Sequence, residues 1–197
     1  QIAELLSTKV SNQITLQLLD VSTTHHKQIN LTAQDLVTSA VPYYTVLINA
    51  TNSQDKVGYL LFNDHIATAT ADLLQAVDYF KSQNITDLVL DLRFNSGGYA
   101  YIANELAAMI GGQKTAGKLF GRYIYNQKYG IEDEYFTQQS YPSGRLLPYL
   151  NLSQLFVLTS KQTCSASEAI INSLSPFMRV IRIGEDTCGK PYGMERE

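Results

Sequence analysis

The chain has 197 residues, of which 45% are apolar, so it can bury a hydrophobic core as one domain or as one domain with a fragment. Its formal net charge is -3, from 15 basic and 18 acidic residues without a long run of either sign, which argues against nucleic acid or an anionic membrane as a partner. No apolar stretch approaches the ~20 residues of a membrane-spanning helix, and Gln1 does not begin a signal peptide. We therefore expect a globular chain that is excised or processed from a longer one.

Residues 1–50 are expected to form a small β-rich segment. Partial alternation over 13–19, a short run over 27–31 and a β-branched, aromatic run over 43–48 predict short strands joined by polar turns. The pattern changes after this segment, so we place a domain boundary there.

The next part of the chain alternates strands and helices. A strand over 57–62, a helix with apolar residues at helical spacing and a strand over 88–92 predict a βαβ unit. The apolar positions of that helix are Leu73, Leu74, Val77 and Phe80. A second helix, over 100–110, ends at two glycines of the kind that cap helices.

A tyrosine-rich stretch over 114–150 has few periodic apolar positions and is expected to form loops and irregular strands over the core. The regular pattern then returns, with a strand over 155–159, a helix from near Ser167 and a strand over 180–183. This alternation predicts an α/β fold in which helices cover a largely parallel sheet.

Three turns each follow an apolar strand, at the end where open α/β sheets place their ligands. The first, over 91–98, reads Asp-Leu-Arg-Phe-Asn-Ser-Gly-Gly. Gly97 and Gly98 permit positive φ and a close backbone approach, which can expose amide N–H groups to an oxyanion. The alternative is a tight strand-to-helix turn that needs glycine for steric reasons.

The second turn, over 163–168, reads Thr-Cys-Ser-Ala-Ser-Glu and precedes a helix. Ser165 would be exposed at the helix N-terminus, where amide dipoles favour the negative charge of a tetrahedral intermediate. The alternative is a capping box formed by Ser165 and Glu168, in which Ser167 can also serve the cap.

The third turn, over 187–190, reads Thr-Cys-Gly-Lys. A lysine in a turn is usually a solvated surface charge. A lysine desolvated in a cleft, however, loses its proton near neutral pH and can take the proton of a serine hydroxyl. A Ser-His-Asp triad through His25, His26 or His65 stays open, although no local signature supports it.

Together the three turns resemble the C-terminal processing peptidases, or tail-specific proteases, whose fold is related to that of the crotonases. The family pattern is Asp-Leu-Arg-Asn-Asn-x-Gly-Gly, then Ser-Ala-Ser-Glu, then Thr-Phe-Gly-Lys, and close versions occur here in the same order. The separation 190 − 165 = 25 also fits the family and selects Ser165 rather than Ser167 as nucleophile. The resemblance covers roughly residues 57–190 and implies a crotonase/ClpP-like core of βαβ units.

The resemblance implies a serine endopeptidase that cleaves exported proteins or peptides near their C-termini. Ser165 would attack the carbonyl, and Lys190 would remove its proton and later supply one to the leaving amine. The N–H groups of Ala166 and of Gly97 or Gly98 would hold the oxyanion. Polypeptides are then the expected partners, and neither a metal nor another cofactor is implied.

The chain also departs from the family pattern. Family members often have Gln four residues after the lysine and an acidic residue eleven after the serine, where this chain has Met194 and Pro176. We therefore expect a dyad without a third member from these positions. The resemblance further implies that residues 51–197 form a catalytic domain truncated at its C-terminus and that residues 1–50 are the tail of a PDZ-like module.

If Ser165 and Lys190 are neighbours, as the resemblance implies, then Cys164 and Cys188 are neighbours too. We hypothesise a disulfide between them, which would imply export to an oxidising compartment such as the periplasm or cell surface. Two buried free thiols are the alternative. Neither cysteine belongs to a pair or cluster with zinc spacing, so a metal site is not expected.

Two other functions are compatible with the same fold. One is a non-catalytic ligand-binding member, which would not need both Ser165 and Lys190 at matched spacing. The other is a crotonase-like acyl-transfer enzyme that uses only the oxyanion amides, which leaves Lys190 unexplained.

Overall fold

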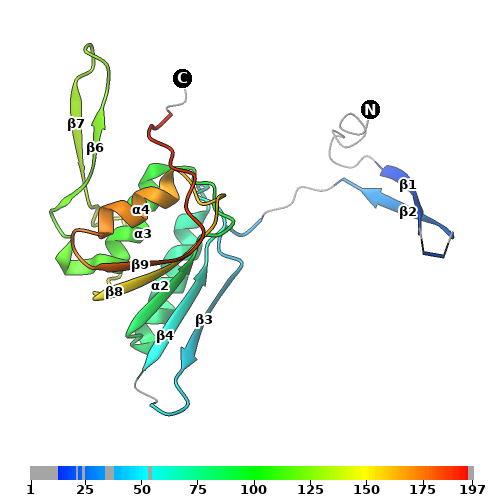
Figure 1. Ribbon diagram of the computed structural model, residues 1–197, viewed down its shortest axis with the longest axis horizontal. Helices are drawn as coiled ribbons and strands as arrows, with labels where there is room; N and C mark the ends of the chain where they lie inside the picture. The colour runs from blue at the N-terminus through cyan, green and yellow to red at the C-terminus, as the bar shows by residue number, and fades with distance from the viewer. Residues whose placement is uncertain (1–12, 21, 24, 34–37, 53–54, 195–197) are drawn as a thin grey trace. The chain divides into compact units, whose positions relative to one another are not determined.

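The computed structural model describes residues 13–20, 22–23, 25–33, 38–52 and 55–194, and Figure 1 traces the chain. Contacts divide the chain into two compact units, Gln1–Thr38 and Ser39–Glu197. In the first unit, β1 (Gln13–Leu19) and β2 (His26–Thr32) pair antiparallel, which confirms the two strands predicted there. The interpretation of this segment as the end of a PDZ-like module stays a prediction.

The second unit contains a five-stranded mixed sheet. Its strands are β3 (Tyr43–Ile48), β4 (Lys56–Leu61), β5 (Asp87–Asp91), β8 (Gln154–Thr159) and β9 (Arg179–Gly184). They lie in the order β3-β4-β5-β8-β9, with β3 antiparallel to β4 and the other pairs parallel. The largely parallel α/β sheet predicted from the sequence is confirmed.

The boundary between the units differs from the one predicted after residue 50. Strand β3 pairs with β4 over its whole length and therefore belongs to the larger unit, which begins at Ser39. The sequence indicates that residues 43–48 form a strand but does not indicate which strand is its partner.

Three helices cover the sheet: α2 (Ala69–Gln83), α3 (Ala100–Gly111) and α4 (Ala166–Leu174). Because the parallel strands follow one another across the sheet, right-handed crossovers place these helices on the same face, where α3 contacts both α2 and α4 (Figure 1). In this unit, the structure contains every helix and strand for which the sequence predicted a start and an end. The observed ends differ from the predicted ones by one residue at most.

The core lies between the sheet and these helices. Its largest fully buried side chains come from both layers: Leu60, Phe62, Leu73, Phe80, Leu88, Leu90, Leu92, Ile102, Leu106, Met109, Ile110 and Leu155. Helix α3 is buried along nearly its whole length, so the chain that follows the first glycine-rich turn runs through the centre of the unit. This burial anchors that turn, since each buried large aliphatic side chain contributes about 1.5–3 kcal/mol.

The tyrosine-rich stretch contains one regular feature that the sequence did not indicate. After the short 3-10 helix η1 (Gly112–Lys114), strands β6 (Leu119–Ile124) and β7 (Ile131–Tyr135) form an antiparallel hairpin that projects from the helices in Figure 1. Much of the hairpin is exposed on both faces, so it lacks the apolar alternation that marks a half-buried strand. Within the described ranges, no helix is long and apolar enough to cross a membrane.

Candidate active site

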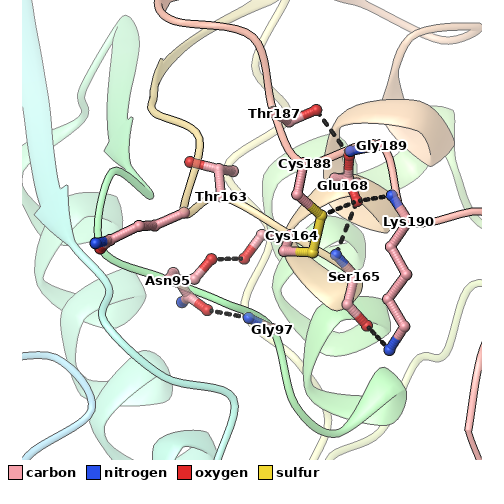
Figure 2. Close-up of a disulfide and its surroundings, with 12 residues drawn as sticks. Asn95, Gly97, Thr163, Cys164, Ser165, Glu168, Thr187, Cys188, Gly189 and Lys190 are labelled. Carbon is pink, nitrogen blue, oxygen red and sulfur yellow. Dashed lines mark hydrogen bonds between the residues drawn. A yellow bond between two sulfur atoms is a disulfide. The ribbon is translucent and has the colours of Figure 1, made fainter.

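Three turns follow the carboxyl ends of three neighbouring parallel strands. They are the glycine turn (residues 92–98) after β5, the serine turn (residues 160–165) after β8 and the lysine turn (residues 185–190) after β9. The strand register places the ends of β5, β8 and β9 level with one another. Turns that lie far apart in the sequence therefore meet at one edge of the sheet, as Figure 2 shows.

Ser165 lies at the start of α4 with φ of 56° and ψ of -118°. Positive φ is sterically costly for a residue with a side chain, and such strain is concentrated at functional sites. The backbone N–H of Ser165 donates to the Glu168 carboxylate at 2.8 Å, as in a capping box. The residue that caps the helix therefore also carries the half-buried hydroxyl that faces the lysine turn.

Lys190 lies beside this hydroxyl. Its Nζ donates to Ser165 Oγ at 3.3 Å, and the Tyr192 ring centroid lies 5.9 Å from the same Nζ. Met194 and Pro176, at the positions where the family often has polar partners, are both exposed, Met194 by 78%. In the part of the chain that the structure describes, Ser165 is the one side chain hydrogen-bonded to Lys190 Nζ.

The two glycines of the glycine turn differ in their amide groups. The Gly97 N–H donates to Asn95 Oδ1 at 3.0 Å and is therefore already used. The N–H groups of Gly98 and Ala166 have no hydrogen-bond partner among the described residues. Of the two glycines expected as alternative oxyanion donors, Gly98 is the one whose amide is free among the described residues, and Gly98 is an exposed residue.

Gly97 instead allows the glycine and serine turns to touch. A Cβ atom at Gly97 would lie 2.7 Å from Ser165 Cβ and 2.9 Å from Ala166 N, and the φ of Gly97 is 98°. Both the close approach and the positive φ exclude a side chain here. The steric alternative considered for the glycine pair thus applies to Gly97.

Asn95 joins the same two turns through buried hydrogen bonds. The backbone carbonyl oxygen of Asn95 accepts the Cys164 N–H at 3.2 Å and the Ser167 hydroxyl at 3.1 Å. The Thr163 hydroxyl donates to the Leu92 carbonyl at 2.8 Å. Ser167, the serine not selected as nucleophile, is fully buried, and its hydroxyl bond to Asn95 helps to hold the two turns together.

A polar cluster supports the glycine turn at the end of β5. The carboxylate of the buried Asp91 accepts from the Arg93 guanidinium at 2.7 Å and from the Tyr59 hydroxyl at 2.7 Å. Burial alone would raise the pKa of Asp91, but these hydrogen bonds outweigh it and lower the pKa, so the carboxylate stays charged.

Glu168 joins the serine turn to the lysine turn (Figure 2), a function for which its capping position gave no signal. Its carboxylate accepts the Thr187 hydroxyl at 2.7 Å, the Gly189 N–H at 2.8 Å and the Lys190 N–H at 3.1 Å, in addition to the Ser165 N–H. Burial would raise the pKa of Glu168, but these hydrogen bonds lower it overall. The ionised carboxylate thus fixes the backbone on both sides of the Ser165–Lys190 contact.

The structure joins Cys164 and Cys188 in a disulfide with a Cα–Cα distance of 5.2 Å, and it contains no free cysteine (Figure 2). The Cys188 N–H also donates to the Thr163 carbonyl at 3.0 Å. In the described ranges, one group of three possible metal ligands occurs, formed by these cysteines and Glu168. Its sulfur atoms are bonded to each other and are therefore not available as thiolate ligands.

The histidines occupy other places. His25 and His26 are exposed in the first compact unit. His65 is fully buried, and its Nδ1 lies 2.9 Å from Asn95 Oδ1. No hydrogen bond joins a described histidine to Ser165, and the Ser-His-Asp alternative has no geometric support in this part of the chain.

The sequence profile of peptidase family S41 matches residues 56–196. The chain therefore belongs to peptidase family S41. It is 28% identical over 136 residues to a carboxyl-terminal-processing protease of Picosynechococcus sp., in an alignment that covers 69% of this chain and 30% of the relative. It is 30% identical over 139 residues to the chloroplastic carboxyl-terminal-processing peptidase 2 of Arabidopsis thaliana, covering 71% and 25%. These alignments span less than a third of either relative.

Solved structures give the same result for the fold. A putative S41 protease from Bacteroides fragilis matches with a TM-score of 0.71 and 30% identity, over 90% of this chain and 48% of that one. A photosystem II D1 C-terminal processing protease matches with a TM-score of 0.59 and 24% identity, over 96% of this chain and 47% of that one. The resemblance to C-terminal processing peptidases and the expected fold class are confirmed.

Proposed function

We propose that this chain is the catalytic part of a serine endopeptidase of the C-terminal processing type, with Ser165 as nucleophile and Lys190 as general base. The observation that carries this proposal is the 3.3 Å contact between Lys190 Nζ and Ser165 Oγ, beside two unpaired amide groups. A nucleophile, a base within hydrogen-bond reach and amides directed at developing charge are the parts that acyl transfer requires.

Acylation begins when the neutral Lys190 amine accepts the hydroxyl proton of Ser165 while Oγ attacks the peptide carbonyl. The carbonyl oxygen becomes an oxyanion, which the N–H groups of Gly98 and Ala166 bind. These amides have no intramolecular hydrogen bond to give up, and Ala166 is the first residue of α4, whose dipole also favours the negative charge.

Collapse of the tetrahedral intermediate breaks the peptide C–N bond. The ammonium of Lys190 donates its proton to the leaving amine, which leaves an acyl-enzyme at Ser165 and a neutral lysine. Lys190 then takes a proton from water, and the resulting attack releases the new C-terminus and restores the hydroxyl. Each proton that Lys190 accepts is returned within the cycle, so no cofactor is required.

Polypeptides are the proposed substrates, cut near their C-termini, because the relatives in this family carry the name of that activity. The disulfide supports an extracytoplasmic location, since such bonds persist in oxidising compartments. We propose export to the periplasm or the cell surface.

Peptide hydrolysis tests the proposal. Ser165→Ala and Lys190→Ala should each lower kcat/KM by at least about 1000-fold while circular dichroism shows the fold unchanged. Lys161→Ala is the matched control, because Lys161 is an exposed lysine of the serine turn whose side chain forms no hydrogen bond or ion pair with the described residues. Undiminished cleavage by either dyad variant would reject the assigned roles.

A further inference from the structure

His65 is a buried polar residue that the proposed mechanism does not use. It lies between β4 and α2, is 0% exposed, and its ring centroid is 4.5 Å from that of Phe62. A histidine in such a place is either a packed core residue or a residue that fixes a neighbour. Its hydrogen bonds distinguish the two.

The ring is bonded to the side chain that controls the glycine turn. Its Nδ1 lies 2.9 Å from Asn95 Oδ1, the same oxygen that accepts the Gly97 N–H at 3.0 Å. Asn95 Nδ2 donates to the Phe62 carbonyl at 2.9 Å, which fixes the orientation of the amide. Because the oxygen therefore faces the ring, His65 Nδ1 is the protonated nitrogen that donates to it.

The other nitrogen is consistent with a neutral ring. His65 Nε2 is buried and has no hydrogen-bond partner among the described residues. A proton on this nitrogen would be buried without an acceptor, and burial accordingly lowers the pKa of His65 to about 4. The imidazole is thus a single-donor group whose one bond is directed at Asn95.

The backbone of His65 forms hydrogen bonds on both sides of Gly98 in the glycine turn. Its N–H donates to the Gly97 carbonyl at 3.3 Å, and its carbonyl accepts the Tyr99 N–H at 2.9 Å. These bonds form a parallel bridge between His65 and Gly98. A Cβ at Gly98 would lie 2.6 Å from the His65 carbonyl oxygen, so the turn has no room to rotate at this point.

We propose that His65 is a positioning residue for the oxyanion hole. Through Asn95 it holds the Gly97 N–H away from the site, and this leaves the Gly98 N–H directed at the reacting carbonyl. The backbone carbonyl oxygen of Asn95 also accepts hydrogen bonds from Cys164 and Ser167, on either side of Ala166. The His65 ring therefore supports both proposed oxyanion donors, Gly98 and Ala166, through Asn95. This inference rests on the proposed function, and His65 itself touches neither substrate nor reacting atoms.

Two substitutions separate hydrogen bonding from packing. His65→Leu removes the donor but fills the apolar site, whereas His65→Asn places an amide nitrogen near the position of Nδ1 and keeps a donor toward Asn95. Phe62→Leu is the matched packing control, since it changes the neighbouring ring and leaves every hydrogen bond of this network in place. His65→Gln, whose amide reaches the Nε2 position instead, replaces His65→Leu if that variant does not fold.

Amide hydrogen exchange gives a readout that does not depend on catalysis. The exchange rate of the Gly97 amide is compared with that of Leu92, the first residue of the same turn, whose N–H donates to the Leu158 carbonyl of β8. We expect the Gly97 to Leu92 ratio to rise at least about tenfold in His65→Leu and to stay at the wild-type value in His65→Asn and Phe62→Leu. An unchanged ratio in His65→Leu would overturn the inference.

Peptide hydrolysis then tests the consequence for catalysis. A small misplacement of one oxyanion donor should lower kcat about 10- to 100-fold with little change in KM, and His65→Asn should restore most of the rate. An equal loss in His65→Asn and His65→Leu would also overturn the inference. A wild-type protein without peptidase activity would reject the proposed function alone, because the exchange ratio still tests the role of His65.

Discussion

The glycine and serine turns are held from inside the molecule, whereas the lysine turn is held at its surface. Asn95, Thr163 and Ser167 are fully or almost fully buried, and their hydrogen bonds join the first two turns. In the lysine turn, residues 185–190 are mostly exposed, and only Thr187 and Lys190 are half-buried. Besides the contact between Lys190 and Ser165, the turn is held by Glu168, by the disulfide and by backbone bonds from Glu185 and Cys188. The carboxylate of Glu185 also accepts the Lys161 N–H at 3.4 Å.

This difference separates two parts of the proposed chemistry. The proposed oxyanion donors, Gly98 and Ala166, lie in turns that buried hydrogen bonds join to each other. The proposed general base, Lys190, lies in a mostly exposed turn whose contacts can be removed by single substitutions or by reduction. Changes in the buried turns should therefore affect both activity and folding, and changes around the lysine turn should affect activity more than the fold.

Gly97→Ala should have the largest effect, because the new Cβ would meet Ser165 Cβ at 2.7 Å in a backbone of positive φ. We expect kcat/KM to fall about 1000-fold, with a loss of unfolding free energy of about 1–3 kcal/mol from strain. Gly117→Ala is the matched control, since its φ is 68° and no atom lies within 4 Å of the added Cβ. Near wild-type cleavage by Gly97→Ala would show that the two turns are not in the described contact.

Reduction of the disulfide tests how strongly this bond holds the lysine turn to the serine turn. The bond closes a loop with a sequence separation of 24, and removing such a cross-link should lower the free energy of unfolding by about 3 kcal/mol. The measurement is urea unfolding with and without a dithiol, compared with a Cys164→Ala, Cys188→Ala double variant that should not respond to the dithiol. Equal stability of the fully reduced and oxidised proteins would contradict a structural role for the bond.

Glu168→Gln keeps the size of the side chain and removes the charge that accepts hydrogen bonds from both turns. We expect kcat/KM to fall about 100-fold, equivalent to about 2.7 kcal/mol, with a smaller change in stability. Asp186→Asn, at an exposed carboxylate of the lysine turn with no hydrogen bond or ion pair among the described residues, serves as control. The same rate in Glu168→Gln as in the wild type would mean that this carboxylate does not position Lys190.

The stability of the folded protein should depend on pH through the buried ring of His65. Burial lowers the pKa of this ring from 6.5 to about 4, so between these values the unfolded chain binds more protons than the folded one. Stability should therefore fall as the pH falls from 6.5 to 4.5, by roughly 2 kcal/mol from this residue. Urea unfolding should show this loss in the wild type relative to His65→Asn, and parallel pH curves would contradict it.

The sequence was sufficient for those parts of the site that depend on local pattern. Apolar runs and helical spacing located the strands and helices of the larger unit, and parallel strands end at one edge of a sheet, so three turns could be expected to meet. The resemblance then supplied the pairing of Ser165 with Lys190, and the structure brings these side chains together.

Other parts depend on side-chain contacts that have no periodic signal. Which glycine keeps a free amide is decided by Asn95 Oδ1, and the Asn95 side chain is hydrogen-bonded to Phe62 and His65, thirty or more residues earlier. Glu168 was visible only as a cap, because its other donors lie 19 to 22 residues further along the chain. The β6–β7 hairpin was missed because exposure on both faces removes apolar alternation.

Covalent labelling of the wild-type protein with a fluorophosphonate tests the central claim most directly, because this reagent reacts with an activated serine hydroxyl. We predict that mass spectrometry places the adduct on Ser165 and that Lys190→Met slows labelling at least about 100-fold while Lys161→Met does not. An adduct on another serine, or an equal rate in Lys190→Met, would contradict the activation of Ser165 by Lys190.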